Sequence, residues 1–116
     1  MILFLGYDKC STCQKAKKWL EEQSVEFTAR PIKEENPTQA ELTEWTAKNN
    51  FPVKRLVNTH GVLYRSMGLA AKMPEMSEEE ILALLATDGM LVKRPILVTD
   101  RGMAAGFKAE EWEKLL

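Results

Sequence analysis

Two cysteines, Cys10 and Cys13, are the residues of this chain whose type and spacing best suit covalent chemistry. They form a C-x-x-C motif directly after the apolar run 2–6, at the start of a stretch with helical periodicity. The free N–H groups and the dipole at a helix N-terminus would stabilise a thiolate at Cys10, and Lys9 adds positive charge. A lower thiol pKa makes more thiolate available for attack at neutral pH. Cys13, one turn later, is expected to be more buried and to resolve a mixed disulfide formed at Cys10.

Other interpretations of the motif stay open. A structural zinc site needs about four ligands, but His60 is the only other cysteine or histidine, so we expect no metal. A permanent disulfide across so short a loop gains little stability and is uncommon in the cytosol. Two unrelated buried cysteines are a third alternative. Ser11 or Thr12, between the cysteines, is expected to help start the helix.

The surrounding patterns predict the elements that position the motif. Short apolar or alternating runs indicate strands. Helical spacing preceded by capping boxes, Thr38 with Glu41 and Ser77 with Glu80, indicates helices. A further short helix is expected to end at Gly68. The expected strands cover 2–6, 25–30, 95–99 and 103–106, and the expected longer helices cover about 11–24, 38–50, 77–88 and 108–116.

The order of these elements predicts the fold class. A β-α-β unit needs parallel strands and a right-handed crossover, and a β-hairpin followed by a helix adds an antiparallel edge. We therefore expect an α/β fold, a thioredoxin-like mixed sheet with a helical insertion at about 37–90 between its β-α-β and β-β-α halves. A chain of 116 residues with 45% apolar residues fits one domain over 1–116.

Arg94 and Pro95, directly before the last buried strand, are the second chemical feature. Thioredoxin-like folds place a cis-proline there beside the C-x-x-C motif, where it shapes the substrate groove. Arg94 would then point toward Cys10 and offer fixed charge and bidentate donors to an oxyanion or carboxylate. The alternative is a solvated arginine before a proline that merely starts a strand.

Composition excludes several functional classes. The net charge is −1, so bulk charge recruits neither nucleic acid nor an anionic membrane. Basic residues nevertheless collect in residues 1–20 and 51–72, and acidic residues in 21–50 and 73–90. No apolar run approaches the roughly 18 residues of a membrane span. The N-terminus shows no basic leader, so we expect a cytoplasmic protein.

The chain resembles the arsenate-reductase-like (ArsC-like) family, which includes the Spx-type regulators. The resemblance extends over essentially the whole sequence. It is carried by residues 4–20 with the C-x-x-C motif, by residues 56–69 with Asn-Thr-His-Gly, and by residues 91–107 with Lys-Arg-Pro-Ile-Leu-Val. It implies that Cys10 is the nucleophile and Arg94 an anion-binding residue.

Several residues depart from the pattern of the glutaredoxin-linked arsenate reductases. Those enzymes usually carry a histidine where this chain has Gly6, and a serine where it has Cys13. Their second and third anion-binding arginines fall near Asn58 and at Phe107. The resemblance therefore implies a two-cysteine redox site more strongly than arsenate reduction.

Three functions follow as expectations. The first is a cytosolic thiol–disulfide oxidoreductase in which Cys10 attacks, Cys13 resolves and Arg94 orients an anionic group. The substrate would be a disulfide or another oxidised small molecule or protein. It would contact Lys9 and Pro95 together with Ser11 and Thr12. No cofactor is expected, and glutathione, glutaredoxin or thioredoxin would return the electrons.

The second expected function, implied by the resemblance, is a Spx-type redox-sensing regulator that binds the RNA polymerase α-subunit. Such regulators usually extend beyond the last helix with a basic tail, whereas the printed sequence ends at Leu116, so we expect the redox enzyme first. A glutaredoxin-dependent arsenate reductase is the third. In each case we expect a monomer without direct contacts to nucleic acid or membrane.

Overall fold

The structure is a computed structural model that describes residues 1–116. The chain divides into two compact units. Residues 1–32 and 94–116 form one of them, which we call the sheet unit. Residues 33–93 form the other, which we call the helical unit. Both cysteines, Arg94 and Pro95 belong to the sheet unit.

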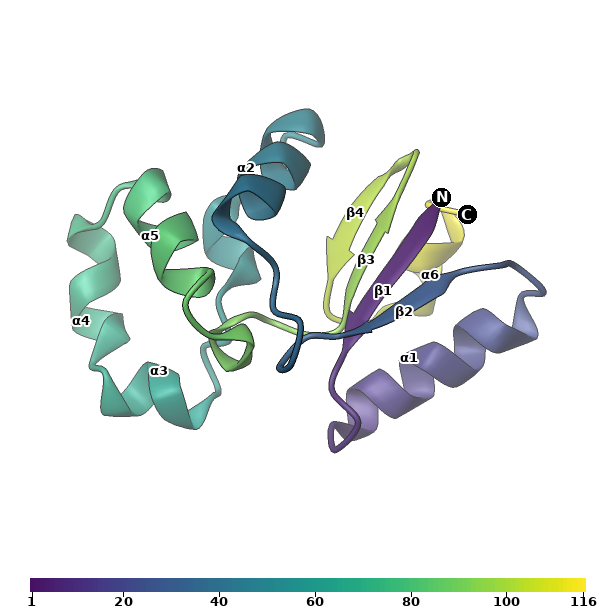
Figure 1. The fold of residues 1–116 in the computed structure, drawn as a ribbon, viewed down its shortest axis with the longest axis horizontal. Coiled ribbons are helices and arrows are strands. Elements are labelled where there is room, and N and C mark those ends of the chain that lie inside the picture. The colour runs from purple at the N-terminus through teal and green to yellow at the C-terminus, as the bar shows by residue number, and fades with distance from the viewer. The chain divides into compact units, whose positions relative to one another are not determined.

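The sheet unit contains a four-stranded mixed sheet and two helices (Figure 1). In chain order, its elements are β1 (Ile2–Gly6), α1 (Ser11–Glu22), β2 (Thr28–Pro31), β3 (Ile96–Thr99), β4 (Gly102–Ala105) and α6 (Ala109–Glu113). The strand order is β2-β1-β3-β4, with β1 parallel to β2 and antiparallel to β3, and β3 antiparallel to β4. A β-α-β half followed by a β-β-α half is the thioredoxin-like arrangement that the sequence predicts.

An aromatic cluster holds α1 and α6 against the sheet. Trp112 of α6 is completely buried. Its ring centroid lies 6.1 Å from that of Phe4 on β1, 6.3 Å from that of Trp19 on α1 and 5.0 Å from that of Phe107. Edge-on contacts at such distances add to the stabilisation that comes from burying these large rings. The cluster therefore fixes α1, and with it the C-x-x-C motif, relative to β1.

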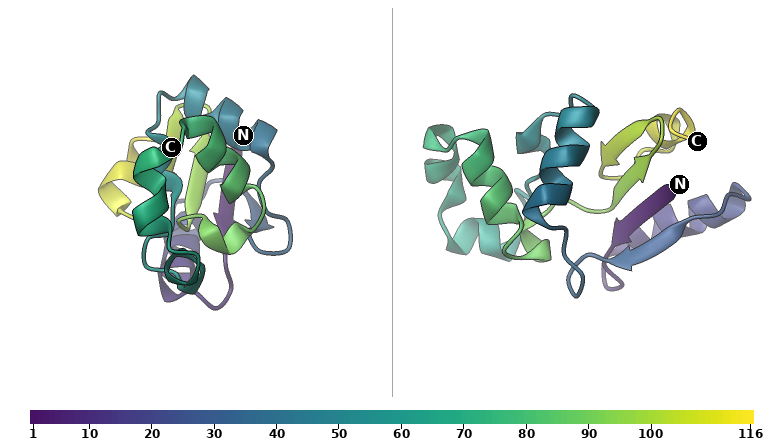
Figure 2. Two further views of the ribbon diagram at one scale, coloured as in Figure 1. Left: turned by 90° about the vertical axis from the view of Figure 1, so that its left-hand side faces the viewer. Right: turned by 45° about the horizontal axis from the view of Figure 1, so that its top comes forward.

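The two ends of the chain lie near each other (Figures 1 and 2). Ile2 pairs with Thr99 across β1 and β3. The Thr99 hydroxyl donates to the carbonyl oxygen of Leu115 at 2.8 Å, which ties the C-terminal residues to the sheet.

The helical unit consists of short helices and confirms the expected helical insertion. Its longer helices are α2 (Gln39–Lys48) and α5 (Glu78–Leu85), which pack against each other. Both begin with the predicted capping boxes, at Thr38 and Ser77. The remaining elements are η1 (Val53–Leu56), α3 (Val62–Ser66), α4 (Leu69–Lys72), η2 (Met73–Glu75) and η3 (Gly89–Leu91). Gly68 separates α3 from α4 in the left-handed region, at φ 63°.

The second strand differs from its prediction. It covers Thr28–Pro31 rather than 25–30. Val25 and Phe27 are partly buried and pack on the aromatic core instead, so their apolar side chains do not mark ladder positions. Pro31 is tolerated because β2 is an edge strand, where a missing N–H need not break the ladder.

No helix of the structure has the length and apolar character to cross a membrane.

Candidate active site

Cys10 occupies the N-cap of α1, one position before the helix begins. Its Sγ accepts a hydrogen bond from the backbone N–H of Cys13 at 3.4 Å. Ser11 or Thr12 was expected to help start this helix, and Ser11 is its first residue, whereas the capping position belongs to Cys10. A sulfur at the N-cap can accept hydrogen bonds from the free N–H groups of the first turn. A thiolate is stabilised most strongly at this position.

The surroundings of Cys10 lower the pKa of its thiol below the ordinary value of 9.0. Partial burial acts in the opposite direction and is the largest single influence. Hydrogen bonds from the Cys13 thiol and from the N–H groups of Cys13 and Thr12 outweigh it, together with the positive charge of Arg94. Cys10 is therefore prepared to react as a thiolate.

Cys13 has the opposite properties. Only 3% of its surface is exposed, whereas Cys10 is half-buried. Burial raises the pKa of Cys13 to about 12, and the neighbouring Cys10 sulfur acts in the same direction. No disulfide joins the two residues in this structure. The pair thus combines one activated thiol with one protected thiol, one helical turn apart.

Arg94 supplies a positive charge that acts on the cysteine pair, and it lowers the pKa of both thiols. Its guanidinium lies over the ring of Tyr7, 5.2 Å from the ring centroid. Nε and Nη1 of Arg94 are buried and have no hydrogen-bond partner. They are therefore charged donors that the chain itself leaves unsatisfied. The Arg94–Pro95 peptide bond is cis, as predicted, and Pro95 is buried directly before β3.

The remaining predicted contact residues lie around the same turn. Lys9 is exposed directly before Cys10, and Ser11 and Thr12 are exposed on the first turn of α1. The structure thus places them at the surface beside the cysteines, where a substrate could reach them; their contact with substrate stays a prediction. No group of three or more histidine, cysteine or acidic side chains lies close enough together to hold a metal ion.

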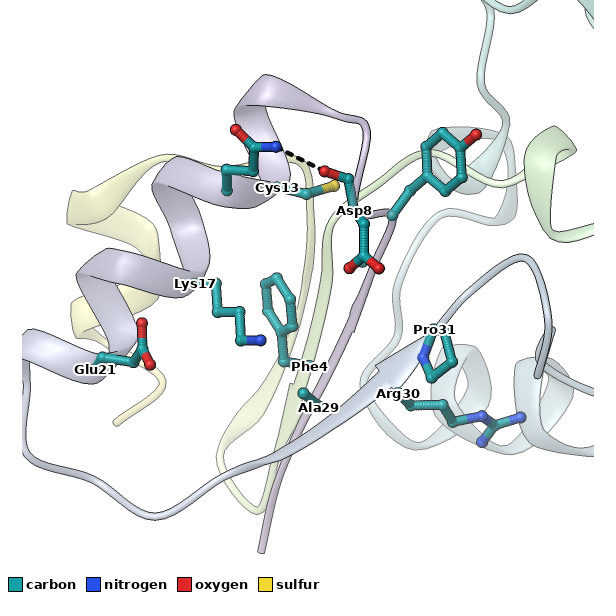
Figure 3. A pocket seen from close by; sticks show the side chains of 11 residues that line it. Phe4, Asp8, Cys13, Lys17, Glu21, Ala29, Arg30 and Pro31 are labelled. Carbon is teal, nitrogen blue, oxygen red and sulfur yellow. Dashed lines mark hydrogen bonds between the residues drawn. The ribbon is translucent and has the colours of Figure 1, made fainter.

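Gln14 is a site residue that the sequence analysis missed. Its side-chain Nε2 donates to the carbonyl oxygen of Asp8 at 2.6 Å (Figure 3). The same loop is closed by a bond from the N–H of Cys10 to the carbonyl oxygen of Tyr7 at 3.0 Å. Gln14 therefore fastens the loop that leads to Cys10 onto the helix that Cys10 caps. Its position after Cys13 offered no motif from which this bond could be predicted.

Replacing Gln14 by alanine should slow alkylation of Cys10 at pH 7. Loss of one hydrogen bond costs about 0.5–1.5 kcal/mol. The loop before Cys10 would then be held less firmly, the capping of the Cys10 sulfur would weaken, and the reactivity of Cys10 should fall about two- to tenfold. The measurement is the rate of iodoacetamide labelling, followed by mass spectrometry. Gln23→Ala is the matched control, because Gln23 donates to the carbonyl oxygen of Trp19 at the far end of the same helix. Equal rates in both variants would contradict this role.

Gly6 and Phe107 explain two departures from the arsenate reductase pattern. A Cβ atom at Gly6 would lie 2.7 Å from the Phe4 ring, which is part of the buried core, so any side chain here must displace it. Phe107 packs against Trp112 and Trp19, with the Trp19 centroid 5.8 Å away. The position of the expected third arginine is thus part of the apolar cluster.

Asn58, at the position of the second expected arginine, lies in the helical unit. Its N–H donates to the carbonyl oxygen of Leu91 at 2.8 Å. Its own backbone oxygen accepts a bond from Gly61. The residue therefore serves the local turn structure, and its neutral amide offers no fixed charge to an anion.

A separate hollow of about 550 Å³ lies beside the cysteine pair (Figure 3). Its walls are the Asp8 loop, the α1 residues Cys13 and Lys17, and β2. Cys10 is not among its lining residues, so the hollow borders the buried cysteine rather than the activated one.

Comparison with known proteins identifies the family. A family model described as the ArsC family matches residues 5–115, and the chain belongs to this family. It is 42% identical over 113 residues to the uncharacterized protein YusI of Bacillus subtilis, covering 97% of this chain and 96% of YusI. It is 30% identical to the regulatory protein MgsR of the same organism, covering 98% and 89% of the two chains. The global transcriptional regulator Spx 2 of Bacillus anthracis is 25% identical, with 100% and 87% covered.

Solved structures show the same fold. The crystal structure of an ArsC family related protein from Bacteroides fragilis is 56% identical and superimposes with a TM-score of 0.94, covering 99% of this chain and 97% of that one. A possible arsenate reductase from Streptococcus mutans is 35% identical, with a TM-score of 0.88 over 97% and 98% of the two chains. The predicted family and the thioredoxin-like fold with its helical insertion are thus confirmed.

Proposed function

We propose that this chain is a thiol–disulfide oxidoreductase in which Cys10 attacks and Cys13 resolves. The observation that carries this proposal is the opposite perturbation of the two thiols, with the pKa of Cys10 lowered and that of Cys13 raised to about 12. Two unrelated structural cysteines have no need of such a difference. A nucleophile and its resolving partner do need it, because only one of them must react first.

The first step is attack of the Cys10 thiolate on one sulfur of a substrate disulfide. A bond forms between Cys10 Sγ and that sulfur, the substrate S–S bond breaks, and the other substrate sulfur leaves as a thiolate. The N-cap position and Arg94 lower the pKa of Cys10 and so raise the fraction of thiolate available for the attack. The substrate would contact Lys9, Ser11 and Thr12, which are exposed next to Cys10 in the sequence. Pro95, the fourth expected contact, is buried.

The second step is attack of Cys13 on the Cys10 sulfur of the mixed disulfide. Cys13 first gives up its proton, for which the departed substrate thiolate is a suitable acceptor. The charge and hydrogen bond of Cys10 help to raise the pKa of Cys13, and the effect of the charge ends when Cys10 becomes neutral in the mixed disulfide. A bond between Cys10 and Cys13 then forms, and the second substrate sulfur leaves as a thiolate. The substrate has gained two electrons, and the chain holds a disulfide.

The cycle closes when an external thiol donor returns two electrons to the Cys10–Cys13 disulfide. Glutathione, glutaredoxin and thioredoxin are donors of the right chemical class, since each supplies electrons by the same exchange reaction. The unpartnered Nε and Nη1 of Arg94 would orient a carboxylate of the donor or of the substrate beside Cys10.

The Arg94→Met variant tests this account. The change removes the charge and keeps a long side chain, so the pKa of Cys10 should rise and the pH profile of disulfide reduction should move to higher pH. Loss of one charge-assisted contact is worth about 1.5–3 kcal/mol, and reduction of glutathione disulfide at pH 7 should fall about tenfold or more. The measurement is thiol release as a function of pH.

Arg101→Met is the matched control, because it removes the same charge from an exposed turn between β3 and β4. Its pH profile should equal that of the unmodified chain. An unchanged profile in Arg94→Met, or no disulfide reduction by the unmodified chain at any pH, would contradict the proposed function.

A regulatory role is the second candidate, favoured by the similarity to MgsR and Spx 2, which are described as regulators. In that case the Cys10–Cys13 disulfide would be a sensor, and the RNA polymerase α-subunit would be the partner. Binding of purified α-subunit that changes when the cysteines are oxidised, without catalytic turnover of any disulfide, would favour the regulator over the enzyme.

A further inference from the structure

The hollow beside Cys13 combines an aromatic floor with charges of both signs. The Phe4 ring forms part of its lining, and Gly6 leaves room for that ring because it has no side chain. In Figure 3, the Lys17 side chain extends from α1 toward Phe4, and the Asp8 carboxylate points into the same space. A volume of about 550 Å³ is in the range of sites for small molecules.

Three of the charged side chains that line this hollow form no ion pair. They are Lys17, Asp8 and Glu21, and Arg30 is a fourth charged residue in the lining. Gln14 donates its hydrogen bond to the backbone oxygen of Asp8 and not to the Asp8 carboxylate. A ligand with one carboxylate and one ammonium group could therefore meet both kinds of charge at once.

The edge strand beside the hollow is poorly suited to an added peptide strand. The N–H of Ile32 donates to the carbonyl oxygen of Gly6 on β1. Because the backbone groups of successive residues in a strand point to opposite sides, those of Ala29 and Pro31 face away from β1. Pro31 has no N–H to offer, and β-augmentation depends on such main-chain bonds. These features favour a compact ligand over an extended polypeptide.

We infer that this hollow binds the zwitterionic α-amino-acid group of a small molecule, with its carboxylate at Lys17 and its ammonium at Asp8. The Phe4 ring would contact the carbon chain of the ligand. Two sources supply this chemical group: a free amino acid, or the γ-glutamyl end of glutathione. Since the proposed function needs a thiol donor, the second source would hold that donor beside the redox pair; to this extent the inference rests on the proposed function.

The test is calorimetric titration of the reduced, full-length chain with S-methylglutathione, L-glutamate and glutarate. S-methylglutathione has no free thiol, so its binding is independent of any exchange at Cys10 and can fail while disulfide reduction succeeds. We expect saturable binding of S-methylglutathione or L-glutamate and at least about tenfold weaker binding of glutarate, which lacks the ammonium group.

Variants locate the binding. Lys17→Gln and Asp8→Asn should each raise the dissociation constant about tenfold, because each removes one charge-assisted contact. Lys18→Gln is the matched control, since Lys18 is exposed on the same helix but does not line the hollow, and its binding should be unchanged. Tighter binding of S-methylglutathione would assign the site to glutathione, and tighter binding of L-glutamate would assign it to a free amino acid. No saturable binding, equal binding of glutarate, or equal effects at Lys17 and Lys18 would overturn the inference.

Discussion

Cys10 should react with iodoacetamide about a hundredfold faster than Cys13 at pH 7 in the folded chain. With a pKa of about 12, Cys13 is deprotonated in only about one molecule in 10⁵ at this pH, whereas Cys10, with its pKa below 9.0, is deprotonated in at least about one in 10². The greater nucleophilicity of the more basic thiolate offsets about thirtyfold of this difference. The burial of Cys13 limits the access of the reagent and so increases the difference in rate again.

The rates are measured by quenching at intervals and by counting labelled peptides in the mass spectrometer. The same labelling in denaturant provides the control, because the two thiols should then react at nearly equal rates. As pH rises, the Cys10 rate should increase through a midpoint below pH 9.0, since the surroundings lower the pKa of Cys10. Similar rates at Cys10 and Cys13 in the folded chain would remove the roles assigned to them.

Arsenate turnover in a glutaredoxin-coupled assay should be at least about 10²-fold below that of a three-arginine arsenate reductase. Arg94 is present, but Asn58 and Phe107 stand where the other two arginines are expected. Each missing charge-assisted contact is worth about 1.5–3 kcal/mol, so the loss of two lowers turnover by about 10²–10⁴. Phe107 packs against Trp19 and Trp112, so its position holds an apolar ring and no charge.

The appropriate comparison is an arsenate reductase with all three arginines, assayed with the same coupling enzymes. Reduction of glutathione disulfide by this chain should be measurable in parallel, which shows that the protein is active. Rapid arsenate turnover that disappears in Cys10→Ser would place the chain among the arsenate reductases despite its residues at 58 and 107.

Patterns that depend on local chemistry were predictable from the sequence. The capping boxes at Thr38 and Ser77 fix helix starts through bonds between neighbouring residues, and both helices begin there. The continuous apolar runs before Gly6 and after Pro95 give β1 and β3, which are the inner strands of the sheet. The second strand was less well predicted because Phe27 is apolar for its contact with Phe4, at a centroid distance of 6.2 Å, and not for a place in the ladder.

The candidate site shows the same limit. The C-x-x-C motif and the pair Arg94–Pro95 were visible because their residue types are unusual in their positions. The capping role of Cys10, the bond from Gln14 to Asp8 and the stacking of Arg94 on Tyr7 were not. Each depends on the path of the loop between β1 and α1, and no residue pattern encodes that path.

Trapping of a mixed disulfide tests the central claim most directly. The unmodified chain, Cys13→Ser and Cys10→Ser are each incubated with glutathione disulfide at pH 7, and the mass of the intact protein is measured after acid quenching. The account predicts a stable adduct of one glutathione at Cys10 in Cys13→Ser, no adduct in Cys10→Ser, and an internal disulfide in the unmodified chain. An adduct on Cys13 in Cys10→Ser, formed as fast as that on Cys10, would contradict it.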